Sequence, residues 1–182
     1  MKYYIAIDNG VTGSCAVLDE DGQCLEYWPT PVEKTLNYTK VVAYISRVRG
    51  DILLERLRPY VENATVVIER PLVNPQMFKA TVSAIRCDEA TRTILEMLKV
   101  KFIYVDSKQW QKEMLPSRTA IPRLPKDATA MEKKERKAKA NAFKLETKSL
   151  SLSVAQQLFP SVTFKKDGDA ILMCEWSRRN KL

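Results

Sequence analysis

The stretch from residue 5 to residue 18, IAIDNGVTGSCAVL, decides how the fold begins. An apolar run ends at Asp8, the turn-forming pair Asn9-Gly10 follows, and a second apolar run then continues to residue 18. After an acidic turn, a third run of the same kind covers residues 23–28. We therefore expect an antiparallel meander of three short strands, with an acid at the end of the first strand.

Hydrophobic spacing predicts helices and strands in turn after this meander. Apolar residues from Val41 to Val61 recur three and four positions apart, which favours an amphipathic helix, bent at Gly50. Further along we expect a strand at 65–69, a helix at 75–98, a strand at 101–105, a proline-rich loop at 115–126, and helices at about 150–159 and 168–179. This order predicts an α/β fold with a five-stranded mixed sheet, its first three strands antiparallel, flanked by helices.

The composition limits the chemistry that this chain can perform. Its 182 residues, 45% of them hydrophobic, are enough for a single domain over residues 1–182 with a sizeable core. It has no histidine, which excludes a Ser-His-Asp triad, a Cys-His pair and an HExxH zinc site. An enzyme of this composition must rely on carboxylates, lysines, metals or groups of its substrate.

The cysteines and the apolar runs indicate a soluble protein of the cytoplasm. The four cysteines stand far apart and never form a CxxC pair, so we expect reduced structural thiols rather than disulfides or a zinc ribbon. The first apolar run is interrupted by Asp8 too soon to act as a signal peptide. No run approaches the ~18 apolar residues of a membrane span.

The formal charge of +8 belongs wholly to the second half of the chain. Residues 1–91 hold 10 basic and 12 acidic side chains, whereas residues 92–182 hold 20 and 10. Between residues 126 and 148, eight basic side chains stand against four acids in an Ala-rich stretch with high helix propensity. This stretch is either a solvated lysine-rich helix or a surface that contacts phosphates.

Four acids are directly attached to the predicted apolar elements. Asp8 ends the first strand, Glu69 ends the fourth, and Asp167 and Asp169 open the last helix. Each acid alone is explained by a turn, a strand end or a helix cap. Carboxylates held close together repel and need cations, and hard oxygen ligands of this kind suit Mg²⁺ or Mn²⁺. Two such ions ~4 Å apart can activate a water and stabilise the leaving oxygen of a phosphodiester without histidine.

Four blocks of the sequence, taken in order, resemble one family. They are residues 5–18, the strand end VVIERP at 66–71, the segment 148–160, and DAILMCEWSRR at 169–179. The ordered set resembles the RuvC-like Holliday junction resolvases of the ribonuclease H-like fold, and the last two blocks are similar to the versions found in bacteriophages and related bacteria. The resemblance touches nearly the whole chain, with a departure at Asn9, where the family frequently has proline.

The resemblance implies a Mg²⁺-dependent endonuclease, with Mn²⁺ as a substitute and two ions per site, that resolves four-way DNA junctions by paired symmetric nicks as a homodimer. Asp8 and Glu69 match the first two metal-binding acids, and Asp169 matches the acid of the family's Asp-Ala pair. The family commonly places the fourth acid three residues before that Asp, at Lys166 here, so we assign Asp167 instead. A phage source would place the protein in the host cytoplasm.

The resemblance also implies residues that contact the DNA. Lys148 matches a lysine that would contact the scissile phosphate. A second lysine of the family falls at Gln111, so Lys108 or Lys112 is expected to replace it. Residues 115–148 are expected to form a loop plus a basic helical segment, partly mobile, that binds DNA. The whole predicted DNA-binding set is Lys108, Lys112, Lys133, Lys134, Arg136, Lys137, Lys139, Lys148, Met77 and Phe78.

We also predict how two single residues and one helix are used in the fold. Trp110 is expected to pack in the core rather than to stack on a base, and Glu175 is expected to be structural despite its charge. Helix 75–98 matches the element that adjoins the family's dimer interface, although its apolar residues could equally belong to the core.

Other interpretations stay open at the level of sequence. The run after Asp8 also resembles the phosphate loop of sugar kinases and actin-like ATPases, but these enclose a nucleotide between two such domains, and 182 residues with five glycines are too few. A non-catalytic DNA-binding module would leave the acids scattered in space. A structure-selective nuclease for flaps, forks, three-way junctions or RNA–DNA hybrids would share both fold and acids.

Overall fold

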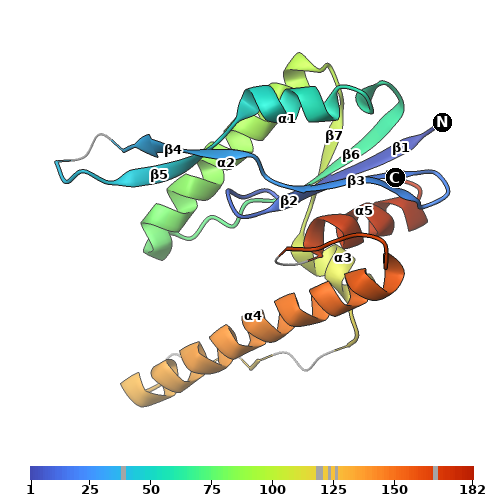
Figure 1. Ribbon diagram of the computed structural model, residues 1–182. Helices are drawn as coiled ribbons and strands as arrows, with labels where there is room; N and C mark the ends of the chain where they lie inside the picture. Colours follow the sequence, from blue (N-terminus) through green and yellow to red (C-terminus); the bar gives the residue numbers. More distant parts are fainter. Residues whose placement is uncertain (38–39, 118–120, 123, 126, 166–167) are drawn as a thin grey trace.

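The predicted strands form one mixed sheet in the spatial order β3-β2-β1-β6-β7 (Figure 1). The computed structural model describes residues 1–37, 40–117, 121–122, 124–125, 127–165 and 168–182. The strands of this sheet are β1 (Tyr3–Ile7), β2 (Ser14–Asp19), β3 (Cys24–Pro29), β6 (Ala64–Glu69) and β7 (Phe102–Val105). The first three pair antiparallel, while β1, β6 and β7 pair parallel. The predicted α/β class and five-stranded mixed sheet are confirmed.

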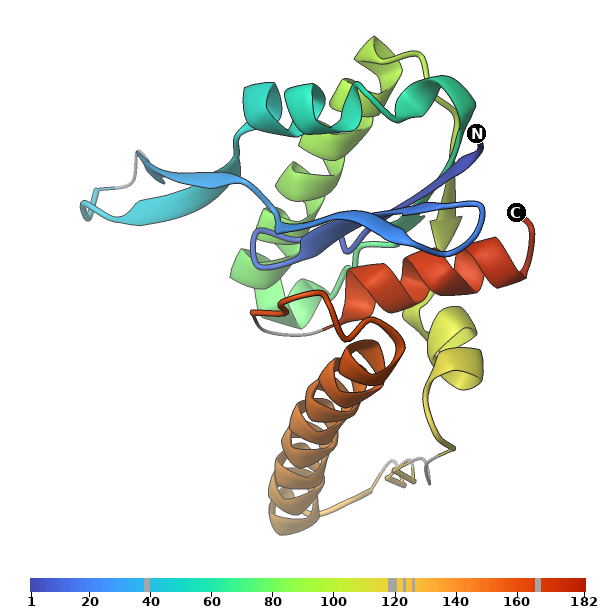
Figure 2. The same cartoon turned by 45° about the vertical axis from the view of Figure 1, so that its right-hand side comes forward.

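Helices cover both faces of this sheet (Figure 2). On one face lie α1 (Gly50–Leu57) and α2 (Phe78–Met97), and on the other lie α3 (Ser107–Met114) and α5 (Asp169–Arg179); the short 3₁₀ turns η1 (Val61–Asn63) and η2 (Pro75–Met77) precede β6 and α2. The two-residue repeat of a strand explains the layering. Ile5 and Ile7 of β1 pack in the cluster with α1 and α2, whereas Tyr4 and Ala6 pack in the cluster with α3 and α5. The helix at 75–98 and the last helix are confirmed, while α3 was not predicted.

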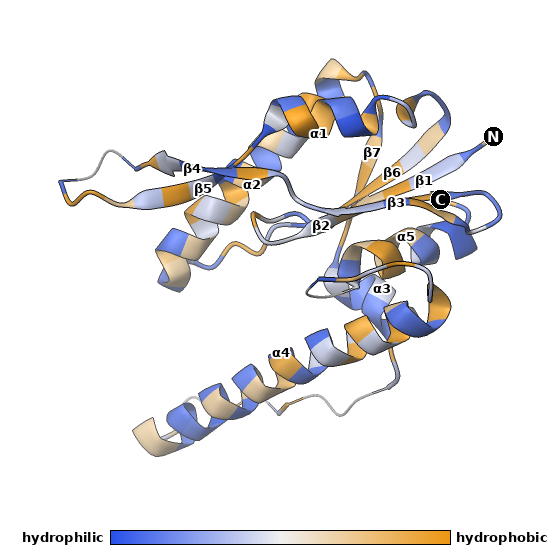
Figure 3. Ribbon diagram, viewed as in Figure 1, coloured by the Kyte–Doolittle hydropathy of each residue, from blue (hydrophilic) through white to orange (hydrophobic). Residues whose placement is uncertain are grey.

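Helix α4 (Ala130–Leu158) is one continuous helix of 29 residues. A capping box begins it, because the Glu132 N–H donates to the Thr129 hydroxyl at 3.2 Å and the Thr129 N–H donates to Glu132 Oε2 at 2.7 Å. Its buried residues are Ser151 and Ala155, near its C-terminal end. The rest extends away from the sheet with mainly hydrophilic side chains (Figure 3).

The prediction of a separate helix at 150–159 was therefore wrong in its start. Residues 127–159 contain neither glycine nor proline and are rich in alanine, lysine, glutamate and leucine, so nothing interrupts the helix between the basic segment and the packed end. The described residues between α3 and α4 form neither helix nor strand, as the prolines of 115–126 predicted. No helix in the described part of the chain is long and apolar enough to cross a membrane.

The helix predicted from Val41 to Val61 is wrong in its first half. A hairpin of β4 (Val32–Leu36) and β5 (Tyr44–Val48) precedes α1 and projects from the body (Figure 1). The two strands pair from Val32 opposite Val48 to Leu36 opposite Tyr44. β-Branched and aromatic residues favour strands when a partner is present, and the helical spacing of Val41, Ile45 and Val48 carried no information about that partner.

Candidate active site

Asp8 and Glu69 leave neighbouring parallel strands at the same edge of the sheet. β1 and β6 pair with Ile7 opposite Ile68, so the next residues, Asp8 and Glu69, emerge side by side. Both are half-buried. The carboxyl ends of adjacent parallel strands are where functional groups collect in open α/β sheets. The acids predicted at these two strand ends therefore share one location.

The turn from Asp8 to Ser14 requires glycine at position 13. The Asp8 N–H donates to Ser14 O at 2.9 Å, and the Gly13 N–H donates to Gly10 O at 3.0 Å. A Cβ at residue 13 would lie 2.0 Å from the Asp8 carbonyl oxygen and 3.1 Å from Asp8 Oδ2. A side chain there would displace the backbone or the carboxylate of Asp8, so Gly13 allows the turn to fold against this acid.

Asp169 is the first residue of α5 and is held by α4. The buried Ser151 hydroxyl of α4 donates to Asp169 Oδ1 and accepts from the Gly168 N–H at 3.3 Å. A Cβ at Gly168 would lie 2.2 Å from the Ala155 Cβ, so the two helices approach too closely for any other residue at this position. The position in the first turn of α5 also favours the negative charge. Packing and hydrogen bonding together fix this carboxylate at the N-terminus of its helix.

One cleft brings the predicted groups together. It has a volume of about 910 Å³, and Asp8, Glu69 and Asp169 all line it. A neighbouring hollow of about 710 Å³ shares Asp169 and three lysines with it. The cationic residues shared by both hollows are Lys108, Lys144 and Lys148. Acids from β1, β6 and α5 therefore share one groove with lysines from α3 and α4.

The remaining predicted site residues divide into four groups. Met77 also lines the cleft, and Lys112 lines the neighbouring hollow together with Gln111. Phe78 is 72% exposed, next to the cleft residue Met77 in sequence but absent from the lining. The predicted basic residues on α4 beyond the cleft are Lys133, Lys134, Arg136, Lys137 and Lys139. Asp167 lies outside the described residues.

Lys144 is a cleft residue that the sequence reasoning placed only in the general basic segment. It precedes Lys148 by four positions, so on a continuous helix both side chains lie on the same face one turn apart. The four-residue spacing was visible in the sequence. It places the two lysines on one face only if the helix continues through Lys148, which the sequence analysis did not predict. Ser151, which orients Asp169, gave no signal of its own, because its role depends on the contact between α4 and α5.

The donor chemistry of the cleft fits a hard divalent cation. Asp8, Glu69 and Asp169 offer carboxylate oxygens, which Mg²⁺ and Mn²⁺ prefer to nitrogen or sulfur. Across residues 1–37, 40–117, 121–122, 124–125, 127–165 and 168–182, no three Asp, Glu or Cys side chains are already grouped as a metal site. The three acids thus supply suitable ligands from three elements without a finished ligand shell.

Two other acids of this region have structural partners. Glu175 of α5 is buried and accepts bonds from Arg178 Nε at 2.8 Å and Arg179 Nε at 2.7 Å. Burial alone would raise the pKa of Glu175, but the two guanidinium groups lower it overall. Asp106, which also lines the cleft, directly precedes α3, and its Oδ2 lies 3.7 Å from Arg70 Nη1. The structural interpretation of Glu175 is confirmed.

The core beside the cleft is apolar and contains free thiols. Trp110 of α3 is fully buried, which confirms that it packs in the core. All four cysteines are unpaired with one another, as expected. Burial raises the pKa of Cys15, and raises that of Cys87 to about 12, and the negative charge of Asp8 adds to both shifts. Both thiols therefore keep their protons well above neutral pH.

Comparisons with known proteins define the class of fold. No protein-family model matches the sequence, and a search of curated proteins found no significant match. The structure is similar to that of RuvC from T. thermophilus in complex with a Holliday junction substrate, with 8% sequence identity, coverage of 100% of this chain and 96% of that chain, and a TM-score of 0.56. A second structure of Thermus thermophilus RuvC is covered over 96% of its length by 97% of this chain, at 9% identity and a TM-score of 0.46. The chain thus has the RuvC-like, ribonuclease H-like fold that the four sequence blocks implied.

Proposed function

We propose that this chain is a divalent-metal-dependent endonuclease that resolves four-way DNA junctions by paired nicks. The observation that carries the proposal is the cleft lined both by acids at the ends of β1 and β6 and the start of α5 and by lysines of α3 and α4. The RuvC structure that shares this fold was solved with a Holliday junction substrate. The absence of histidine agrees with a mechanism in which carboxylates hold the metal and lysines bind the phosphates, without an imidazole.

Asp8, Glu69 and Asp169 are the cleft acids that would hold Mg²⁺ or Mn²⁺. Asp8 and Glu69 would do so from adjacent strand ends and Asp169 from the start of α5, with Asp167 as the expected fourth ligand. A bound divalent cation would supply an activated water and stabilise the charge on the leaving oxygen of a phosphodiester. Ser151 would keep the Asp169 carboxylate aimed into the cleft through its hydrogen bond.

The lysines of the cleft would bind and orient the phosphate backbone. Lys144 and Lys148 lie one turn apart on α4, and Lys108 lies on α3 across the shared hollow. An ammonium group donates short, charge-assisted hydrogen bonds to phosphate oxygens and favours the extra negative charge of the transition state. Lys148 is assigned to the scissile phosphate and the other two to its neighbours.

Apolar side chains beside the cleft would contact bases at the branch point. Leu72, Val73, Met77 and Phe78 are each more than half exposed on the segment that follows Glu69, and Leu72 and Met77 line the cleft itself. Unpaired bases stack on apolar and aromatic surfaces, and such contacts tolerate any sequence. At a branch point the base stack is interrupted, so base faces near the centre can be opened to such contacts, whereas a continuous duplex keeps its bases stacked.

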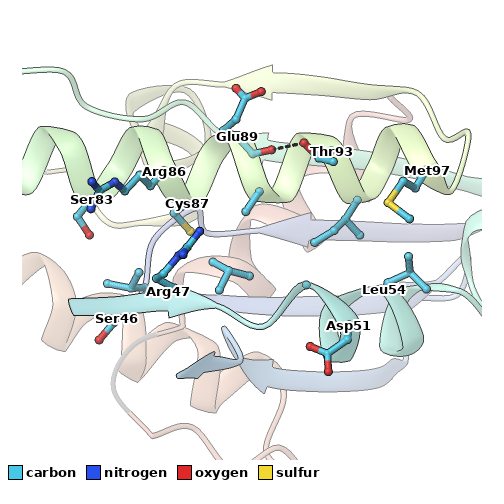
Figure 4. A pocket seen from close by; sticks show the side chains of 15 residues that line it. Ser46, Arg47, Asp51, Leu54, Ser83, Arg86, Cys87, Glu89, Thr93 and Met97 are labelled. Atoms are coloured by element: carbon cyan, nitrogen blue, oxygen red, sulfur yellow. Dashed lines mark hydrogen bonds between the residues drawn. The ribbon is translucent and has the colours of Figure 1, made fainter. Parts of the chain in front are cut away.

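A homodimer would present two clefts to one junction. A groove of about 580 Å³ separates β5 and α1 from α2 (Figure 4). Arg47 and Arg86 lie toward one end of it, and Leu54 and Met97 toward the other. Asp51 and Glu89 also line it, so this surface carries both signs of charge and can pair with its own copy across a two-fold axis without like charges meeting. We expect light scattering to report a dimer, and Arg86→Glu to weaken it.

The test of the proposed function is a cleavage panel in Mg²⁺ with mapped products. Four-way, three-way, flap and linear DNA of matched sequence should be cut by the wild-type protein mainly at the four-way junction, as symmetric paired nicks. Asp8→Asn should slow cutting by more than about 100-fold. Its binding to the junction should survive or strengthen, because the substitution removes a negative charge near phosphate.

Asp21→Asn is the matched control for this substitution. Asp21 lies exposed in the turn between β2 and β3, at the opposite end of the sheet from Asp8. We expect Asp21→Asn to cut at the wild-type rate. Equal cutting of every branched substrate would instead indicate a general debranching nuclease. An Asp8→Asn variant that cuts as fast as wild type would overturn the assignment of the acids.

A further inference from the structure

Asp88 of α2 joins three elements behind the cleft. Asn9 Nδ2, from the turn after β1, donates to Asp88 Oδ1 at 2.7 Å. The Tyr104 hydroxyl, from β7, contacts Asp88 Oδ1 at 2.8 Å and Oδ2 at 3.0 Å. One half-buried carboxylate on a helix therefore ties down a strand and the turn that carries Asp8.

The Asn9 side chain is held at both of its polar ends. Its Nδ2 donates to Asp88, and its Oδ1 lies 3.5 Å from the Thr91 hydroxyl, three residues further along α2. A hydrogen bond to an ionised carboxylate is about twice as strong as a neutral one. The amide is thus clamped to the surface of α2, and the backbone of residue 9 follows it.

The clamp acts directly beside an acid of the cleft. Asp8 and Asn9 are adjacent in the chain and both line the cleft. Asp88 does not line the part of the cleft that the structure describes. Asp88 is therefore placed to influence the Asp8 carboxylate through the backbone, without touching a substrate. The pKa of Tyr104 reflects its own contact with Asp88, because burial and the hydrogen bond to Asp88 raise this pKa to about 12.

We propose that Asp88 is a positioning residue that fixes the Asp8 carboxylate in the cleft by clamping Asn9. This inference rests on the proposed nuclease function for its catalytic consequence, and on the hydrogen-bond geometry for the clamp itself. The clamp thereby ties α2 to the turn that carries Asp8.

The test separates the Asn9 bond from the Tyr104 bond. Asp88→Ala removes both bonds, Asn9→Ala removes the first together with the 3.5 Å contact to Thr91, and Tyr104→Phe removes only the second. Asp88→Asn keeps an Oδ1 acceptor for Asn9 and serves as the conservative rescue.

We expect Asp88→Ala and Asn9→Ala to slow single-turnover cleavage of a four-way junction in Mg²⁺ about tenfold. Junction affinity should stay within about twofold, and Tyr104→Phe and Asp88→Asn should cut near the wild-type rate.

The double variant Asn9→Ala/Asp88→Ala decides whether the two residues act as one unit. It should be no slower than Asp88→Ala alone, since both substitutions break the same bond. Additive losses, or an Asp88→Ala variant that cuts normally while its thermal midpoint falls, would overturn the inference and leave Asp88 with a role in stability only.

Amide hydrogen exchange of the metal-free protein supplies a readout that does not need activity. Exchange in residues 9–13 should quicken in Asp88→Ala and Asn9→Ala but not in Tyr104→Phe. Unchanged exchange in all three would contradict the clamp. A wild-type protein that cuts no branched DNA would overturn the proposed function instead, and the exchange pattern would still show whether Asp88 holds the turn.

Discussion

At the scale of single residues, burial sets the chemistry of the thiols and of one phenol. It raises the pKa of Cys15 and Cys174, which are completely buried, and it raises that of Cys24 to about 11 and of Cys87 to about 12. Tyr104 is shifted upward in the same way, with help from Asp88. In each case the folded protein holds its proton more tightly than the unfolded chain does.

This difference predicts a loss of stability in alkali. Below about pH 7.5 both states keep their thiol protons, so the contribution is fully present. As the pH rises, the unfolded chain releases protons that the folded protein retains, and folding weakens until the folded pKa values are reached. The urea midpoint should therefore fall steadily between about pH 8.5 and pH 11.

Cys87→Ala provides the control for the alkaline effect. Its midpoint should be lower at pH 7, because a packed buried side chain is truncated, but it should fall less steeply with pH than that of the wild type. A midpoint that stays constant to about pH 11 would show that the thiols are accessible in the folded protein.

The acids of the cleft were predictable from sequence because each ends or begins an element. Asp8, Glu69 and Asp169 stand at junctions between apolar runs and turns, and parallel pairing then brings the first two together. Ser151 and Asp88 could not be predicted in the same way, since each acts through a contact between elements distant in the chain. Their residue types and local spacing are ordinary for a helix.

At the scale of elements, α4 and α5 pack closely against each other beside the site. The Gly168 Cα faces Ala155, and an added Cβ would lie 2.2 Å from the Ala155 Cβ and 2.9 Å from the Ser151 carbonyl oxygen. Neither neighbour is the flexible end of a long side chain. A larger residue must therefore push the two helices apart and move Asp169 with them.

Gly168→Ala should accordingly destabilise the protein by about 1–3 kcal/mol through overpacking. Gly10→Ala is the matched control, because a Cβ there would find its nearest neighbours at 3.9 and 4.0 Å. The comparison requires only urea midpoints and slopes for the two variants. Equal midpoints would mean that α4 and α5 can separate without loss.

The free part of α4 gives a second prediction at this scale. Its first turns depend on the Thr129–Glu132 capping box rather than on packing, since the buried residues of α4 are Ser151 and Ala155. Thr129→Ala should cost about 1 kcal/mol of local helix stability. Amide exchange over residues 131–140 should quicken, while the amides near Ser151 should be unaffected. Uniform acceleration along α4 would show that the helix opens as one unit.

The element scale also shows where hydrophobic spacing misleads. A helical repeat is present at Val41, Ile45 and Val48, yet β5 forms because β4 pairs with it. The spacing of apolar residues does not show whether a partner strand is available. The opposite error occurred in α4, where two predicted segments are one helix because no residue between them stops it. Helix ends marked by proline or glycine were predicted better than those marked by nothing.

At the scale of the whole molecule, charge is divided between the body and α4. The second half of the chain carries the whole positive excess, and Lys133, Lys134 and Lys137 are exposed on the part of α4 that extends beyond the cleft. Lys144 and Lys148 continue the same helix into the cleft. A DNA arm bound in the cleft would therefore meet a basic helix as it leaves, and lysine–phosphate contacts release counterions.

The salt dependence of junction binding tests this arrangement. Replacing Lys133, Lys134 and Lys137 with glutamine should flatten the plot of log affinity against log salt by about one unit for each lysine–phosphate pair that is removed. Cutting at saturating protein should stay near the wild-type rate, because the three lysines lie outside the cleft. The matched control replaces Lys99, Lys101 and Lys181, which are equally exposed and lie at the end of the sheet opposite Asp8. Both triple variants lower the net charge by the same amount, so an equal flattening of the slope would mean that total charge attracts the DNA and that α4 offers no particular path for it.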